Sequence, residues 1–111
     1  MKYLCLVYLE ERKLHAINDR ECQACGDDFR QSGVLVAAEA LQSVETATTV
    51  RVRNGKVRIT DGPFAETKEQ LAGFYLIEAR DLNDALMAAS KIPPAREGSI
   101  EVRPVRELNL E

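Results

Sequence analysis

The chain has 111 residues and a net charge of −3 at pH 7, from 15 Lys and Arg, 18 Asp and Glu and one neutral His. This length predicts one domain over residues 1–111, and the acidic balance excludes a general nucleic-acid binder, which would carry a basic excess. No apolar run reaches the about 18 residues of a membrane-spanning helix, and the acidic break after residues 3–9 is not typical of a signal peptide, so we expect a cytoplasmic protein without a membrane partner.

The first third of the chain predicts a strand, a helix and a second strand. Residues 1–9 are apolar on both sides, which predicts a central strand, and residues 10–18 are polar without a clear period. Residues 19–32 favour a helix because Cys22, Cys25 and Phe29 share one stripe, although Gly26 weakens it by about 1 kcal/mol relative to Ala. Residues 34–38 then read as a short buried strand.

A β-hairpin is the clearest local signal. Residues 46–53 and 56–60 alternate apolar and polar side chains around Asn54-Gly55, a pair typical of a two-residue type I′ turn. Counting outward from this turn predicts two faces. On the apolar face Val52 lies opposite Val57 and Val50 opposite Ile59, and on the cationic face Arg53 lies opposite Lys56 and Arg51 opposite Arg58.

The remaining elements complete an α+β pattern. A turn at 61–64 and a polar loop at 65–70 precede a strand at 73–79, Asp81 caps a second helix that stops before Pro93, and residues 99–105 form a closing strand. This order predicts a ferredoxin-like βαββαβ fold with an inserted β-hairpin and both helices on one sheet face. The open face predicts a homodimer packed sheet to sheet.

The stretch DGPFAETKEQLAGFYLIE at 61–78 resembles the YCII-related family, and specifically its DGPF branch, named for residues 61–64. Similarity extends to residues 34–39, the hairpin, Asp81-Leu82 and residues 99–104. The resemblance implies a ferredoxin-like fold that pairs into a dimeric α+β barrel. The family's biochemical function is largely unestablished. A His and an Asp recur in the wider family, which therefore looks enzymatic, and DGPF proteins occur linked to sigma-70 factors of the extracytoplasmic-function kind.

Asp61 is the candidate catalytic residue, because a carboxylate at a strand end before a Gly-Pro turn can be held at a cleft as a general acid or base. The alternative is a turn residue whose side chain bonds the following amides. Four further residues are candidates for binding, or else solvated surface charges: Glu39, Glu66, Lys68 and Arg103.

Histidine and cysteine offer weaker candidates. His15 is the natural partner for an Asp in proton transfer, but it lies where the family resemblance is poorest, which favours a solvated histidine. Cys22 and Cys25 have the spacing of a redox or zinc motif. A zinc site needs four ligands and the whole chain holds only three Cys and one His, and a redox pair belongs at a helix N-terminus, whereas this pair lies within the predicted helix, so core packing is favoured. We expect no metal and no cofactor.

The positive charges on the cationic face of the hairpin repel one another and call for a negatively charged partner. Like charges directly opposite each other cost roughly 0.2–1 kcal/mol per pair, and Arg51, Arg53, Lys56 and Arg58 form two such pairs. A partner subunit's acids, a small anionic ligand or an acidic protein would compensate them, unless salt and long side chains screen the repulsion.

Three functions fit these features. The first is a small-molecule-binding homodimer or cofactor-free enzyme with its site near the Asp61 loop. The second is a regulatory module that contacts a sigma factor through the charged hairpin. The third is a purely structural dimer domain.

Overall fold

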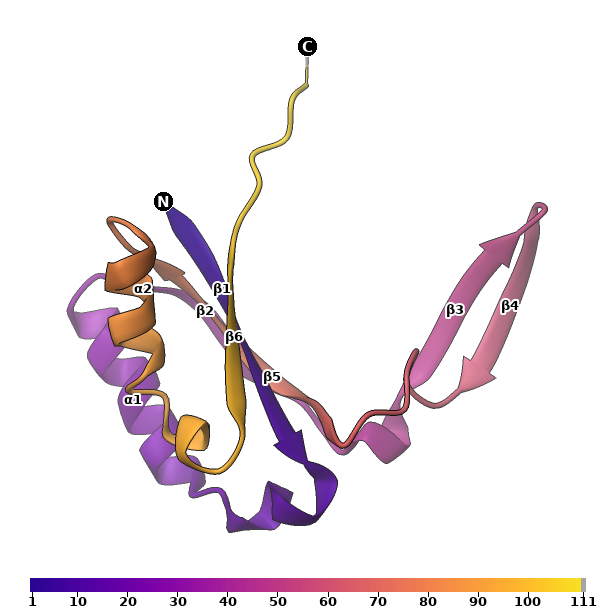
Figure 1. Cartoon of the computed structure of the whole chain (residues 1–111), viewed down its shortest axis with the longest axis horizontal. Coiled ribbons are helices and arrows are strands. Elements are labelled where there is room, and N and C mark those ends of the chain that lie inside the picture. The colour runs from indigo at the N-terminus through magenta and orange to yellow at the C-terminus, as the bar shows by residue number, and fades with distance from the viewer. Residues whose placement is uncertain (111) are drawn as a thin grey trace.

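The computed structural model describes residues 1–110 and contains a four-stranded antiparallel sheet (Figure 1). Its strands are β1 (Lys2–Glu10), β2 (Leu35–Ala40), β5 (Glu69–Glu78) and β6 (Ser99–Pro104), in the order β2-β5-β1-β6. That order with two intervening helices is the ferredoxin-like α+β arrangement predicted from the sequence. Strand β1 is central, as its apolar residues on both sides predicted.

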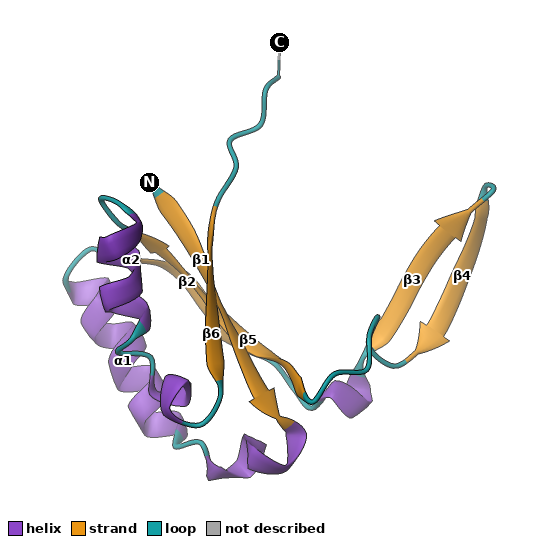
Figure 2. Cartoon of the chain, in the orientation of Figure 1, coloured by secondary structure: helices purple, strands orange, loops and turns teal. Residues whose placement is uncertain are grey.

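Two helices cover one face of this sheet (Figure 2). Helix α1 (Asp19–Gln31) begins at Asn18, whose side chain accepts hydrogen bonds from the Arg20 and Glu21 amides. Helix α2 (Leu82–Ala89) begins at Asp81, which caps it as predicted. The core between the layers combines alternate residues of the central strands with a few helix residues: Tyr3, Cys5, Val7, Tyr75, Ile77, Phe29, Ala85 and Ala89.

Three 3₁₀ segments join these elements: η1 (Glu11–Ala16), η2 (Val44–Thr46) and η3 (Pro93–Arg96). Segment η1 lies within the stretch 10–18, for which the sequence indicated no period. Strand β5 begins at Glu69, so the predicted loop 65–70 extends too far and the strand predicted at 73–79 begins too late. None of the helices within residues 1–110 is long and apolar enough to span a membrane.

Strand β2 is an edge strand, and the prediction of a buried strand at 34–38 is wrong in that respect. Its pairing with β5 shifts between Leu35 and Ala37, and Val36 is 45% exposed. Only Leu35 and Ala38 pack against the core. The short apolar run could not distinguish a central strand from an edge strand, because each has apolar residues on its helix-covered side.

The second face of the sheet has no helix over it. The register places Leu4 opposite Leu76 and Leu6 opposite Phe74, and these side chains alternate with the core residues of the same strands. The middle of this face is therefore apolar. On the β6 edge Leu4 lies beside Arg103 and Leu6 beside Glu101, which form an ion pair at 3.7 Å.

Strands β3 (Thr48–Arg53) and β4 (Lys56–Asp61) form a separate two-stranded ribbon, here called the hairpin arm, that projects from the sheet (Figure 1). Asn54 and Gly55 adopt φ of 52° and 74°, which confirms the predicted turn, and every predicted cross-strand pair is present. The radius of gyration is 15.8 Å, against about 13 Å for a compact chain of this length, because the arm stands clear of the sheet.

Two glycines respond oppositely to an added methyl group. A Cβ at Gly98 would lie 2.1 Å from the Tyr8 carbonyl oxygen, so Gly98→Ala should lower the free energy of unfolding by about 1–3 kcal/mol. A Cβ at Gly26 meets nothing within 4 Å, and Gly26→Ala should raise it by about 1 kcal/mol through helix propensity. Urea denaturation measures both; equal effects would contradict the packing described around Gly98.

Candidate functional site

An open cleft of about 1110 Å³ lies between the base of the hairpin arm and the end of the sheet. We call it the foot cleft, and it is lined by residues of the arm, of the loop after it and of β1, β5 and β6. Polar side chains in its lining include Thr49, Thr67, Glu69, Ser99 and Glu101, and apolar ones include Tyr8, Val44, Phe64 and Leu71. Ser99 donates a hydrogen bond to Glu69 at 2.7 Å across this lining.

Asp61 ends β4 at the base of the arm, and it does not itself line the cleft, whose lining includes Pro63 two residues later. The turn after it is closed by the Gly62 amide, which donates to the Ala47 carbonyl at 2.8 Å, and by the Thr49 hydroxyl, which donates to the Gly62 carbonyl at 2.7 Å. The Asp61 carboxylate is exposed and forms no hydrogen bond or ion pair with another residue in 1–110. The turn is thus held without the Asp61 side chain, which is left available to a ligand.

The structure does not gather the other candidates around Asp61. Glu39 lies on edge strand β2 and Arg103 on the opposite edge strand β6, three strand spacings or about 14 Å apart. Glu66 is exposed on the loop, and Lys68 reaches Glu10 instead. Within the chain these residues therefore do not form a single binding site.

Glu10 is the one buried charged residue among residues 1–110, and the sequence did not single it out. Its Oε1 lies 3.3 Å from Lys68 Nζ and its Oε2 lies 2.7 Å from Arg12 Nε. The Arg12 contact is short but misaligned, so Oε2 is buried without a well-directed hydrogen bond. The acidic residue directly after an apolar strand was the available signal, but its burial depends on the loop that returns from the arm.

Opposing effects act on the pKa of Glu10. Burial favours a higher pKa, but the hydrogen bond from Lys68 and the positive charges of Arg12, Lys68 and Lys13 outweigh it. The pKa of Glu10 is consequently lowered from its ordinary value, and the carboxylate is charged at neutral pH. This ion cluster fixes the loop between the arm and β5 to the end of β1.

The cationic face of the arm has the predicted pairs of like charge, Arg51 opposite Arg58 and Arg53 opposite Lys56. Arg51 donates to the Phe64 carbonyl at 3.4 Å and Arg53 to its neighbouring Val52 carbonyl at 3.1 Å. None of the four cations forms an ion pair within the described part of the chain. Their charge is available to an anion or an acidic surface.

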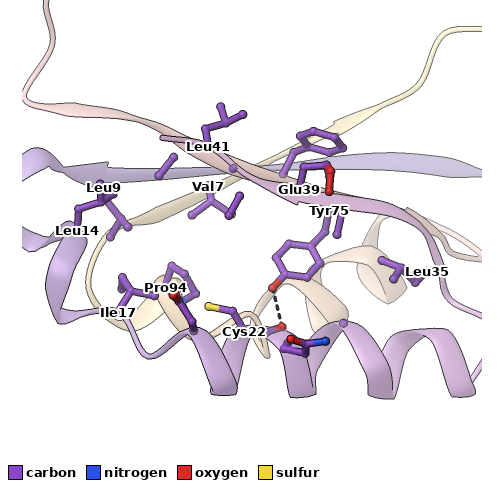
Figure 3. A pocket seen from close by; sticks show the side chains of 18 of the residues that line it. Val7, Leu9, Leu14, Ile17, Cys22, Leu35, Glu39, Leu41, Tyr75 and Pro94 are labelled. Carbon is purple, nitrogen blue, oxygen red and sulfur yellow. Dashed lines mark hydrogen bonds between the residues drawn. The ribbon is translucent and has the colours of Figure 1, made fainter. Parts of the chain in front are cut away.

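A second hollow of about 430 Å³, here called the α1 cavity, lies between α1 and the sheet (Figure 3). Tyr75 projects from β5 toward α1, and its hydroxyl donates to the Cys22 carbonyl at 3.1 Å. Leu14, Ile17 and Pro94 gather at one end of the cavity and Leu35 lies at the other. The α1 cavity and the foot cleft share only Leu41 in their linings.

The cysteines and His15 do not form a reactive group. Burial raises the pKa of Cys25 to about 11, and burial together with Asp19 and Glu21 raises the pKa of Cys22, so both are thiols at neutral pH. Cys25 donates to the Lys91 carbonyl at 3.7 Å and packs against the core, as the packing interpretation predicted. His15 is exposed on η1 and makes no contact with Asp61 among the residues described. No cluster within residues 1–110 is arranged to hold a metal ion.

Comparison with known proteins gives the family. The model of the YCII-related domain matches residues 1–109. The chain belongs to the YCII-related family. It is also 41% identical over 88 residues to an uncharacterized protein of Rhizobium meliloti (strain 1021), a match that covers 78% of this chain and 71% of that relative.

The ion pairs of Glu10 with Arg12 and Lys68 make the stability of this YCII-related protein depend on pH in the acid range. A lowered pKa contributes stability that is present above the unfolded Glu pKa of about 4.3 and is lost as pH falls through the folded pKa. Glu10→Gln should therefore lower the free energy of unfolding at pH 7, and this deficit should shrink between about pH 5 and pH 3.

Chemical denaturation at several pH values measures this deficit. Glu66→Gln is the matched control, because Glu66 is exposed on the same loop as Lys68 and has no ion pair within residues 1–110. A deficit for Glu10→Gln that stays constant with pH would show that the charge of Glu10 is not what stabilises the fold.

Proposed function

We propose that this YCII-related protein is a cytoplasmic homodimer that binds a small molecule in the foot cleft beside the Asp61 loop. The observation that carries the proposal is the hairpin arm, whose apolar face has no cover within the chain. Val50, Val52, Val57 and Ile59 are between 58% and 67% exposed. An isolated two-stranded ribbon is marginally stable in water, so this arm needs a surface to pack on.

A second copy of the chain is the occupant that the fold favours. The uncovered face of the sheet presents Leu4, Leu6, Phe74 and Leu76, which supply an apolar surface of the kind that the arm requires. A two-fold axis would bring each arm against the partner subunit, and each surface would be used twice. The family resemblance to a dimeric α+β barrel agrees with this arrangement.

The same pairing would complete the foot cleft. As an open cleft of about 1110 Å³ it is larger than most ligand pockets, which measure about 300–1,000 Å³. A partner subunit that covers the arm would reduce the opening and exclude water from one side. The free carboxylate of Asp61 lies two residues before Pro63 of the lining, and it is the group on which an acid–base reaction there would depend.

A small anionic ligand is what the cationic face of the arm favours, whereas the charged residues in the lining of the foot cleft are two carboxylates, Glu69 and Glu101. The arm carries four cations without ion pairs inside residues 1–110, and Arg51 already extends toward the loop at the Phe64 carbonyl. An anion bound near the base of the arm would relieve the repulsion between Arg51 and Arg58. The ligand would thus contribute to ordering the arm.

Val57→Lys tests the dimer. Fully burying an apolar side chain of this size contributes about 1.5–3 kcal/mol, so the substitution should weaken dimerisation at least about tenfold. In sedimentation velocity at micromolar concentration, wild type should sediment as a dimer and Val57→Lys should shift toward monomer. Thr60→Lys adds the same side chain to the cationic face of the same strand and should remain dimeric. A monomeric wild type would refute the dimer.

Asp61→Asn tests the site. Wild-type protein screened against a panel of neutral, cationic and anionic metabolites should show ligand-dependent increases in melting temperature. These increases should be lost or strongly reduced in Asp61→Asn and kept in Asp28→Asn, which changes an exposed carboxylate on α1. Full retention of every increase in Asp61→Asn would place the ligand elsewhere.

A second candidate function is supported by the cationic face of the arm, which also suits an acidic protein surface. Under this alternative the protein is a regulatory module that binds an extracytoplasmic-function sigma factor. Binding to the cognate sigma factor should weaken as salt increases and should be reduced in Arg51→Gln/Arg58→Gln, because exposed charges are screened over about 10 Å at 0.1 M salt. A complex insensitive to both changes would exclude this surface.

A further inference from the structure

The α1 cavity is a hollow on the helix-covered side of the molecule, between α1 and the sheet, and it is open to solvent on one side. Gly26 is buried on the inner side of α1, yet a Cβ built on it would meet no other atom within 4 Å. A buried position with vacant space beside it marks a real gap between the layers. At about 430 Å³ this gap lies within the range of small-molecule sites.

The gap persists because α1 contacts the sheet at few points. Only Gly26 and Phe29 of the helix are buried. The Phe29 ring meets the Tyr75 ring edge to face, with centroids 6.0 Å apart, and the Tyr75 hydroxyl reaches the Cys22 carbonyl. These two contacts hold the helix away from β5, and the space beside them is bordered by Val7, Leu9 and Ile17 (Figure 3).

The lining selects against charged ligands. The side chains that face the interior from the sheet and from η1 are mainly apolar, and a bare charge would lose hydration without gaining a partner. The charged residues of the lining on the α1 side include two carboxylates, Asp19 and Asp27, whereas Glu39 pairs with Phe74 and lies on the other face of the sheet. The one cation in the lining, Arg30, is already paired with Asp27 at 2.9 Å. An anion would be repelled, so a neutral molecule fits best.

Tyr75 supplies a polar anchor in this apolar space. Its hydroxyl hydrogen is donated to the Cys22 carbonyl and the Cys22 side chain also lies at this hydroxyl, which leaves one lone pair of Oη to accept a hydrogen bond from a ligand. A ligand with one O–H donor and an apolar ring matches that single acceptor. Burial raises the pKa of Tyr75, so the hydroxyl stays neutral and keeps this role at physiological pH.

We propose that the α1 cavity is a second binding site, which takes a small neutral phenol or aryl alcohol with its ring among Val7, Leu9 and Ile17 and its hydroxyl donating to Tyr75 Oη. This site is separate from the Asp61 loop and from the arm, because no residue of either lines it, and the residues proposed to hold the ligand lie on the helix-covered side, away from the sheet face proposed for the homodimer. The inference therefore stands or falls separately from the function proposed for the foot cleft.

Titration of the full chain with 4-ethylphenol tests the site. Calorimetry should show saturable binding below about 1 mM, consistent with a ligand of nine heavy atoms. Amide chemical shifts in ¹H–¹⁵N NMR spectra should change in α1 and β5 and not in the arm. Absence of saturable binding to wild type, or shifts confined to the arm and the foot cleft, would overturn the proposal.

Two variants make the test specific. Gly26→Leu places a side chain in the vacant space and should weaken binding at least tenfold, whereas Ala24→Leu adds the same side chain on the exposed side of α1 and should bind as wild type does. Gly26→Leu also removes a helix-breaking glycine, so folding should be preserved. If Gly26→Leu is folded and binds with wild-type affinity, the ligand is not in this cavity.

Tyr75→Phe tests the hydrogen bond between the ligand and the Tyr75 hydroxyl separately from the apolar packing of the ligand in the cavity. It should weaken 4-ethylphenol binding several-fold and leave the affinity for ethylbenzene, which has the same shape without the hydroxyl, unchanged. Equal loss for both molecules would show that Tyr75 acts by holding α1 in place and would exclude it as the acceptor.

Discussion

Strand β1 lies between β5 and β6, and its pairing with both neighbours determines which side chains meet the helices. Tyr3, Cys5 and Val7 face the helical layer, while Leu4 and Leu6 alternate with them on the other side. A shift of one residue in this register would exchange the two sets. Both the core and the uncovered apolar face therefore depend on one set of strand pairings.

Local signals in the sequence were sufficient for much of the fold. Asn54-Gly55 fixes the hairpin because both residues adopt positive φ, and Asp81 fixes the start of α2 through its bond to the Asp84 amide. These features require only neighbouring residues. The edge position of β2 and the length of β5 depend on which strands pair across the chain, and apolar patterning alone does not encode that.

The candidate site was predictable to a lesser degree. The pairing of Arg51 with Arg58 followed from counting outward from a turn, and it is present. The burial of Glu10 did not follow from any local pattern, since it requires Lys68 to return to the end of β1 from 58 positions along the chain. Likewise, nothing in the spacing of Glu39 and Arg103 indicated that they would lie on opposite edges of the sheet.

The few points at which α1 is anchored have a consequence for the dynamics of the molecule. Protection of an amide against hydrogen exchange follows the free energy of the smallest opening that exposes it, and segments with few buried contacts open at the lowest cost. A helix that buries only Gly26 and Phe29 should detach and return while the four strands stay paired. The amides of α1 should exchange well before those of β1, and solvent should enter the helix-covered side without global unfolding.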